Sequence, residues 1–372
     1  MQDKLIFLIG PPRSGSTLLM RMVSTHSQIY SRPEPHLMTP LAHMGVYDNV
    51  DKAPYDQLQS AQSIAEFIRD LPGGEADYLD AVRAFSDVMY GRMLKTQEKP
   101  YFLDKTPAYS LILPFLVKVF PKAKYIVLTR HPCSVWDSYA ESFFDGDYAA
   151  AKDFNPILPR YVPAIARFLR ENAVEHVHVR YEDIVSDPEP QLQRIYAHIG
   201  VPHEPETVNY GRQKPKVEGG LGDPLGVNKH SRPVTSSMEK WAQNAAAEPG
   251  RVEILREICG GLHPDDVRAW GYDPATLFEP LDRVDVPKAQ QKALEAKKKE
   301  KWDRYRVQRR ALVVLRRDIH NKALGKLLTK VRFFCDVLLR GGGESFNLYK
   351  DLQYGERGAL PKARQPEPDD GE

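Results

Sequence analysis

The chain has 372 residues, of which 42% are hydrophobic and 27% are charged. This composition is typical of a globular protein and excludes a wholly disordered or collagen-like chain. No run approaches about 18 consecutive apolar residues, which argues against a membrane-spanning helix, and the apolar stretch at residues 5–10 is too short for a secretion signal. The three cysteines are widely spaced, so we exclude a disulfide framework and a cysteine-based zinc site and expect a reducing, cytoplasmic setting.

The net charge of +2 conceals an asymmetry along the chain. Residues 283–340 hold 18 Lys and Arg against 6 Asp and Glu, a net charge of +12, and the rest of the chain carries a net charge of −10. Such a shift often marks a domain boundary, which we place near Leu281. The sequence therefore predicts one domain over residues 1–282, a basic amphipathic helical extension over 283–340, and a polar, disordered tail over 341–372.

Strand-like and helix-like runs alternate along the first 200 residues. Short apolar strands separated by helices imply a parallel sheet that is covered on both faces, so the predicted fold class is α/β, with helices flanking the sheet. Residues 203–235 carry several Pro and Gly and are expected to form a long loop. The expected strands are residues 5–9, 101–103, 125–129 and 176–181, and the expected helices are residues 17–25, 111–120, 132–142, 191–199, 236–247 and 251–259.

The most informative motif is GPPRSGST, at residues 10–17, between the first expected strand and helix. This position presents backbone N–H groups and a helix N-terminus to an anion, while Arg13 adds a positive fork and Thr17 a hydroxyl. The glycines match the P-loop of NTPases, but Ser16 stands where that motif has its lysine. We therefore expect a P-loop-like site for a phosphate-like group rather than an ordinary ATPase site; an ordinary strand–turn–helix joint is the alternative.

Residues 12–17 resemble the 5′-phosphosulfate loop of sulfotransferases that use 3′-phosphoadenosine-5′-phosphosulfate (PAPS). A second element is similar to the 3′-phosphate motif of that family: Arg130 follows the strand at 125–129, and Ser138 lies eight residues later. A guanidinium can fork onto a phosphate, and Ser138 lies about two helical turns further on roughly the same face. The resemblance implies that PAPS is a co-substrate, bound with no metal by Arg13, Ser14, Gly15, Ser16, Thr17, Arg130 and Ser138.

Two further segments resemble the same family. Residues 179–185 are similar to its fourth-strand signature, which places Tyr181 near the adenine. Residues 221–234 resemble the loop that closes over the nucleotide, with Lys229 and Arg232 among its positive donors. The resemblance, nearest to the tyrosylprotein-type and related bacterial branches, implies transfer of a sulfuryl group to a hydroxyl on a small molecule, lipid or glycan. One departure is Ser142, which stands where the tyrosylprotein branch has another arginine.

Sulfuryl transfer needs a base, positive donors and an in-line arrangement of the attacking and leaving oxygens. The resemblance to the tyrosylprotein branch assigns the base to Glu34; His36 competes for this role because an imidazole titrates near neutrality. It also assigns Lys105 to the bridging oxygen of PAPS, and we expect Asp104 to orient that lysine. The spacing of acidic, His and Cys residues predicts no metal site.

The basic extension carries apolar residues at helical spacing from Leu312 to Leu338. Such a helix could lie on an anionic membrane, dock a carrier protein, or pack on the acidic body, and these alternatives stay open. No aromatic-interleaved motif favours nucleic acid, which we do not expect as a partner.

Two rival functions remain, a P-loop nucleotide kinase or phosphotransferase and a non-enzymatic membrane-binding module. Loops at 40–80 and 140–160 are expected to shape the acceptor pocket; the sequence leaves the acceptor and the oligomeric state open.

Overall fold

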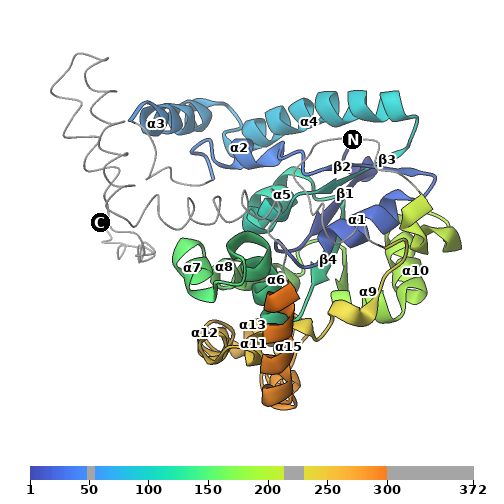
Figure 1. The fold of residues 1–372 in the computed structure, drawn as a ribbon. Helices are drawn as coiled ribbons and strands as arrows, with labels where there is room; N and C mark the ends of the chain where they lie inside the picture. The colour runs from blue at the N-terminus through green and yellow to red at the C-terminus, as the bar shows by residue number, and fades with distance from the viewer. Residues whose placement is uncertain (48–54, 213–229, 300–372) are drawn as a thin grey trace.

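The computed structural model of the chain describes residues 1–47, 55–212 and 230–299. Its centre is a five-stranded sheet in the order β2-β3-β1-β4-β5, and every neighbouring pair is parallel. This arrangement confirms the predicted α/β class (Figure 1). The strands are β1 (Leu5–Ile9), β2 (Ile29–Pro33), β3 (Tyr101–Lys105), β4 (Lys124–Thr129) and β5 (His176–Arg180).

Helices cover both faces of the sheet, as Figure 1 shows. Helices α1 (Ser16–Ser24), α9 (Tyr181–Ser186) and α10 (Pro188–Ile199) pack on one face. The other face is covered by α4 (Glu75–Gln97), α5 (Leu113–Val119), α6 (Pro132–Phe144) and α8 (Ile157–Glu171). All five side chains of β1 are buried, and they alternate between the two cores, as expected for a central strand of a parallel sheet.

Strand β2 was not predicted. Only Ile29 and Tyr30 at its start are apolar, and Ser31, Arg32 and Pro33 follow. This composition fits an edge strand, where Pro is tolerated and one side of the strand has no neighbour. The consequence for function is direct, because β2 delivers the residues after Pro33 to the same sheet edge as the end of β3.

The segments 40–80 and 140–160, predicted as loops, are largely helical, and that expectation is wrong. Helices α2 (Met38–Ala42), α3 (Tyr55–Asp70) and α7 (Tyr148–Phe154) lie there, together with the first turns of α4. The runs are rich in Ala, Gln, Glu and Leu, which favour helix, so propensity outweighed the irregular spacing of their apolar residues. The expected helices at 236–247 and 251–259 are confirmed as α11 (Lys240–Ala246) and α12 (Pro249–Gly260).

The last helices of the described chain pack on α6 and α8 and on one another. The remaining helices there are α13 (Pro264–Ala269), α14 (Glu279–Asp282) and α15 (Val286–Lys299). Helix α15, past the predicted boundary near Leu281, packs against α11 and buries Ala289. The apolar stripe at 312–338, the tail at 341–372 and Lys229 lie outside the described residues. Among the helices of the described ranges, none is both long and apolar enough to cross a membrane.

Short 3-10 helices complete the described chain. One of them, η2, continues the segment after β3 and leads into α5. Another, η6, precedes α11. Their bounds are η1 (Gln2–Lys4), η2 (Pro107–Leu111), η3 (Pro205–Val208), η4 (Tyr210–Arg212) and η6 (Thr235–Ser237).

Candidate functional site

The loop after β1 turns sharply into α1. Gly15 has φ 91°, a left-handed conformation that favours glycine, and a Cβ there would lie 2.4 Å from the ring of Tyr181. Arg13 also has a positive φ, of 70°. The Ser14 hydroxyl is buried and has no hydrogen-bond partner among the described residues. The backbone conformation of Arg13 and Gly15 therefore shapes the loop, and the buried Ser14 hydroxyl could hydrogen-bond to a ligand.

Arg130, at the end of β4, lies directly against this loop. Its Nη1 donates to the carbonyl oxygen of Arg13 at 3.1 Å, and its Nη2 donates to that of Ser237 at 3.0 Å. The guanidinium also lies 4.3 Å from the ring centroid of Tyr181. Its Nε is buried and unpartnered within the described ranges. Arg130 thus has a spare N–H donor next to the loop that carries the unpartnered Ser14 hydroxyl.

The two motifs that the sequence assigns to phosphate binding meet in space. Arg13 Nε donates to Ser138 Oγ at 3.2 Å, although the two residues are 125 positions apart. Ser138 lies on α6, which begins directly after the Arg130 turn. This contact places the hydroxyl of the second motif beside the guanidinium of the first, so one anionic ligand could reach both.

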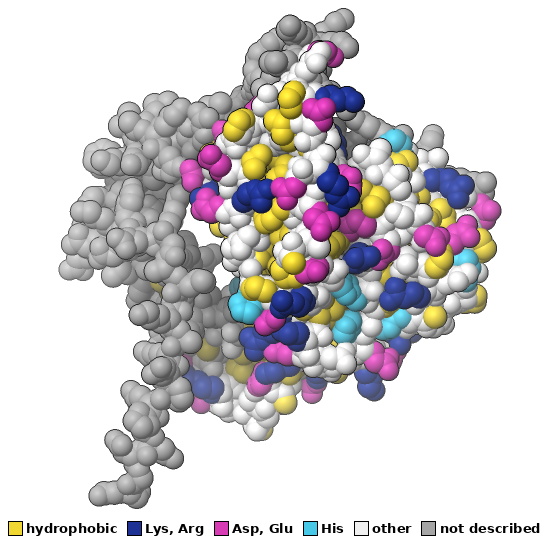
Figure 2. Space-filling model, turned by 90° about the horizontal axis from the view of Figure 1, so that it is seen from below, with side chains coloured by type: hydrophobic (Ala, Val, Ile, Leu, Met, Phe, Trp, Pro, Cys, Tyr) yellow, Lys and Arg dark blue, Asp and Glu magenta, His cyan; other side chains and the backbone are white. Residues whose placement is uncertain are grey.

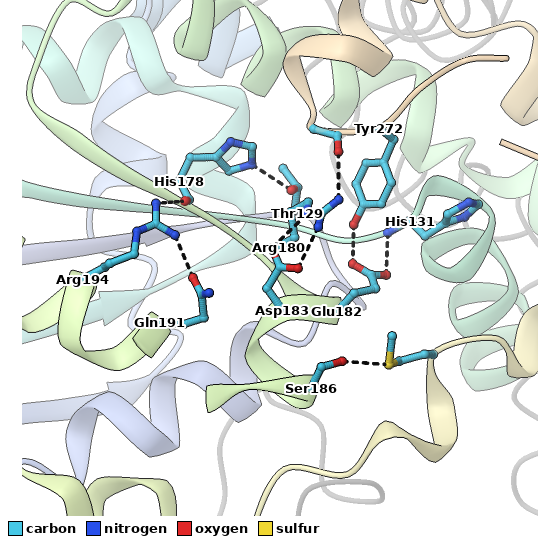
Figure 3. A network of polar contacts seen from close by, with 12 residues as sticks. Thr129, His131, His178, Arg180, Glu182, Asp183, Ser186, Gln191, Arg194 and Tyr272 are labelled. Atoms are coloured by element: carbon cyan, nitrogen blue, oxygen red, sulfur yellow. Dashed lines mark hydrogen bonds and ion pairs between the residues drawn. The ribbon is translucent and has the colours of Figure 1, made fainter. Parts of the chain in front are cut away.

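A polar network holds the Arg130 turn from the C-terminal side (Figure 3). Glu182 Oε1 accepts from the His131 backbone N–H at 3.1 Å, and the Tyr272 hydroxyl donates to Oε2 of the same carboxylate. The indole N–H of Trp270 donates to the carbonyl oxygen of Arg130 at 2.8 Å. Sequence reasoning missed Trp270 and Tyr272, because both lie about 140 residues from the turn in sequence and belong to no local motif.

His131 itself is enclosed by this packing. Its ring stacks on Trp241 at 4.9 Å between centroids, and it meets the edge of Tyr272. Burial, and then the charge of Arg130, lower the pKa of His131 to about 4. The imidazole is therefore neutral at ordinary pH and serves packing rather than proton transfer.

The same network fixes the end of β5. Arg180 donates from Nη2 and Nε to both carboxylate oxygens of Asp183, at 2.7 and 2.9 Å (Figure 3). On β5 as well, His178 Nε2 lies 2.8 Å from Thr129 Oγ1. The segment 179–185 thus has a strong structural role, which stabilises the strand end that carries Tyr181.

Lys105 ends β3 and is almost wholly buried, at 1% exposure. Its Nζ donates to Glu34 Oε1 at 2.5 Å and to Thr17 Oγ1 at 3.4 Å. Register explains the pairing, because Pro33 of β2 lies opposite Lys105, so the next residue, Glu34, leaves the sheet beside the lysine. The predicted base and the predicted positive residue are therefore brought together, and the same ammonium also contacts the loop at residues 10–17.

His36 lies further from this centre than Glu34. Its Nε2 is 3.9 Å from Glu34 Oε2, beyond hydrogen-bond distance, and its side chain is 37% exposed against 16% for Glu34. Both residues have positive φ, of 35° for Glu34 and 54° for His36. Such backbone conformations in non-glycine residues cluster at functional sites.

Asp104 does not take the place expected for it. Consecutive residues of a strand point to opposite faces, so its carboxylate lies on the face opposite the Lys105 ammonium. There it accepts hydrogen bonds from Tyr90 at 2.7 Å, Thr106 at 2.8 Å and Tyr109 at 3.2 Å. Burial raises its pKa to about 6. The expectation that Asp104 orients Lys105 is therefore wrong.

Tyr181 and Arg232 have different surroundings. The Tyr181 hydroxyl shares a hydrogen bond with Ser237 Oγ at 2.8 Å, while its ring packs on Gly15 and Arg130. Arg232 is exposed, and its carbonyl oxygen accepts from Tyr210 at 3.2 Å. Across the described ranges, acidic, His and Cys side chains form no group that could hold a metal ion.

Comparison with known proteins decides the family. The model of the sulfotransferase family matches residues 6–205, more than half of the chain. The chain belongs to the sulfotransferase family. Nodulation protein NoeE of Sinorhizobium fredii is 31% identical to this sulfotransferase over 216 residues, which cover 52% of this chain and 49% of that protein. The match therefore spans only about half the length of NoeE.

Two other similar proteins bear sulfotransferase names. Protein-tyrosine sulfotransferase A of Caenorhabditis elegans is 23% identical over 285 residues, covering 72% of this chain and 67% of that protein. Among solved structures, the sulfotransferase domain from the curacin biosynthetic pathway is 25% identical, with a TM-score of 0.45, and covers 70% of this chain and 98% of that one. Membership of the family leaves no support for the nucleotide-kinase alternative.

Proposed function

We propose that this sulfotransferase moves the sulfuryl group of PAPS to a hydroxyl acceptor by in-line displacement. The observation that carries the proposal is the position of Lys105. Its buried ammonium contacts Thr17 of the phosphate-binding loop on one side and the Glu34 carboxylate on the other. The Lys105 ammonium thus lies between the loop proposed to hold the donor and the carboxylate proposed to receive the acceptor's proton.

The donor site fits an anion at both ends. Two buried donors, the Ser14 hydroxyl and Arg130 Nε, have no partner in the part of the chain that the structure describes, and an anionic oxygen would satisfy both. We assign the 5′-phosphosulfate to the loop at residues 13–17 and the 3′-phosphate to Arg130 and Ser138. Three further nucleotide contacts are proposed, at Tyr181, Lys229 and Arg232.

The chemistry then follows from the positions of Glu34 and Lys105. The acceptor oxygen attacks sulfur as its proton passes to the Glu34 carboxylate, and the bond between sulfur and the 5′-phosphate oxygen breaks. Lys105 stabilises the charge that develops on that leaving oxygen, so the products are a sulfate ester and 3′-phosphoadenosine-5′-phosphate (PAP). His36 is the alternative base, and its greater distance from Lys105 favours Glu34.

The acceptor is proposed to be a hydroxyl on a small molecule, lipid or glycan. We further propose that Tyr161, a buried residue of α8, lies near the base: burial raises its pKa, and the charge of the Glu34 carboxylate adds to this rise. A neutral phenol facing the base side could hydrogen-bond an acceptor without competing for its proton. No metal is assigned a role.

Radiolabelled PAPS offered with pools of phenols, alcohols, hydroxylated lipids and glycans tests the proposal. We expect label to enter at least one pool with the wild-type protein. We expect it to be lost with Lys105→Met, which keeps the bulk of the side chain and removes its charge, while PAP still binds. Transfer that is unchanged in Lys105→Met would contradict the assigned role of the lysine.

The basic segment at 283–340 is proposed to attach the enzyme peripherally to an anionic membrane, on the cytoplasmic side. On the face seen in Figure 2, basic and acidic side chains are interspersed. We therefore assign the attraction to anionic lipid to the segment with net charge +12 and not to this face. Truncation after Lys299 retains α15 and its packing. We expect it to abolish sedimentation with anionic vesicles and to leave PAP binding intact; unfolding of the truncated protein would favour a segment packed on the body.

A further inference from the structure

A buried hydroxyl lies behind the Glu34–Lys105 pair, on the opposite face of β3. Tyr109, in η2, donates from its hydroxyl to Asp104 Oδ2 at 3.2 Å. The Tyr109 hydroxyl oxygen in turn accepts from the backbone N–H of Met38 at 3.0 Å. One phenol thus joins a fixed carboxylate in the sheet to the segment that follows Glu34.

Met38 is the first residue of α2, and its N–H has no partner within that helix. The residue before it, Leu37, provides no side-chain cap, so the Tyr109 oxygen satisfies this donor. Helix α2 is also held from α4, where the Tyr78 hydroxyl donates to the Leu41 carbonyl oxygen at 2.5 Å. The start of α2 is therefore bound to buried groups rather than to solvent.

The segment between β2 and α2 carries the unusual backbone of the site. Glu34 and His36 both have positive φ, a conformation that persists only where the surroundings determine it. The segment is fixed at one end by the pairing of Pro33 with Lys105 and at the other by the bond from Met38 to Tyr109. Loss of either end would allow the backbone to relax and the Glu34 carboxylate to leave the lysine.

We propose that Tyr109 is a positioning residue for the transfer reaction: through Met38 it holds the base segment in the conformation that places Glu34 against Lys105. The inference rests on the proposed role of Glu34. Tyr109 touches neither donor nor acceptor in this account, so its removal should affect turnover and leave donor affinity alone.

Tyr109→Phe removes the hydroxyl and keeps the ring, which packs edge-on against Phe7 at 6.1 Å. We expect kcat to fall roughly tenfold to a hundredfold, because a small misplacement of a catalytic group has effects of that size. The KM for PAPS and the affinity for PAP should stay at wild-type values. This separation of kcat from KM distinguishes positioning from a general loss of structure.

Tyr90→Phe is the matched control, because Tyr90 donates to the same oxygen of Asp104, while the Met38 N–H donates to Tyr109 and not to Tyr90. It should keep near-wild-type kcat. Equal losses in the two variants would show that the carboxylate network matters only for structure, and would overturn the proposal. A Tyr109→Phe variant with wild-type kcat would overturn it as well.

A double-mutant cycle separates this inference from the proposed function. If Tyr109 acts through Glu34, then adding Tyr109→Phe to Glu34→Gln should lower the residual rate no further. An undiminished effect in the Gln background would overturn the positioning role and leave the function standing. Full activity of Glu34→Gln itself would overturn the proposed base, and the inference with it.

Hydrogen exchange of the wild-type protein provides a measurement that needs no variant. The Met38 amide, at the first position of a helix, should be strongly protected because it is buried and bound to Tyr109. Exchange at Met38 as rapid as at an unbonded N-terminal amide would contradict the proposal.

Discussion

The donor side and the base side of this site are built in different ways. The donor side uses the loop after β1 and the turn after β4, two neighbouring strands inside the sheet, and Arg130 there is 8% exposed. The base side uses β2, the edge strand, and a segment in which Glu34 and His36 both have positive φ. The first is supported by the core on both faces, while the second depends on a few individual contacts.

This difference indicates which structural features determine nucleotide binding and which determine the position of the base. The proposed donor binding follows from the way a parallel sheet presents loops and helix N-termini at the carboxyl ends of its strands. The geometry of the proposed base follows from one ion pair, between Lys105 and Glu34, and one hydrogen bond, which the Met38 N–H donates to the Tyr109 hydroxyl. Substitutions on the base side should therefore change the rate, and those on the donor side should change nucleotide affinity.

The largest expected effect is on the base side. Glu34→Gln nearly preserves shape and removes the ability to accept a proton, so turnover should fall roughly 10²–10⁴-fold. Nucleotide affinity should change little. Steady-state rates with PAPS and a working acceptor, together with PAP affinity from calorimetry, measure the two quantities separately.

His36→Asn is the companion variant, and it should cost much less than Glu34→Gln. If the Asn variant loses activity while the Gln variant keeps it, the base is His36. If both remain active, the base lies outside this segment.

Acidification should change the contributions of buried groups on the two sides to the free energy of unfolding in opposite directions. His131 behind the donor side, and His178 on β5, have their pKa values lowered from 6.5 to about 4 by burial. The unfolded chain binds their protons more readily, so their stabilising contribution is lost as pH falls from 6.5 to 4. Burial raises the pKa of Asp104, behind the base side, from 3.8 to about 6, so its contribution is instead lost as pH rises through that window.

The stability lost on acidification through His131 and His178 exceeds the stability gained through Asp104. These three groups together should therefore lower the free energy of unfolding by about 3 kcal/mol on acidification from pH 6.5 to 4, since each unit of pKa difference corresponds to about 1.4 kcal/mol. Burial also raises the pKa values of Asp137 and Glu141, which opposes this fall. Urea unfolding across this range measures it, and His178→Gln should weaken the dependence. A pH dependence that is the same in His178→Gln as in the wild-type protein would show that burial does not lower the pKa of this histidine as described.

A smaller effect is expected on the donor side. Arg130→Ala removes a charged donor and should weaken PAP binding by about 2–3 kcal/mol, with little change in kcat at saturating donor. The matched control is Arg194→Ala, which removes an arginine bound to the His178 carbonyl and Gln191 in the network of Figure 3, away from the loop at residues 13–17. Equal losses of PAP affinity in the two variants would argue against a specific contact at Arg130.

The donor side could be predicted from sequence because its residues follow apolar strands at short, fixed distances. The loop at residues 10–17 and the Arg130 turn are local patterns, and four strands were recognised from the runs that precede such patterns. The structure also brings together the residues predicted for base and positive stabiliser, Glu34 and Lys105, as an ion pair. Their catalytic roles remain predictions.

The rest could not be predicted, for physical reasons that differ from place to place. Strand β2 begins with only two apolar residues, Ile29 and Tyr30, and an edge strand need not be apolar throughout. Tyr109 and Trp270 act through single hydrogen bonds to distant backbone groups, at Met38 and Arg130, and no sequence period marks such contacts. The orientation of Asp104 was open to reasoning, since alternation along β3 already separates it from Lys105.

The central claim is that the paired phosphate-binding elements select a 3′-phosphorylated adenosine nucleotide. Isothermal titration calorimetry of PAP, ATP and AMP, each without magnesium, tests it most directly. The account predicts that PAP binds far more tightly than ATP or AMP and needs no metal. ATP binding as tight as that of PAP, or PAP binding that requires magnesium, would contradict it.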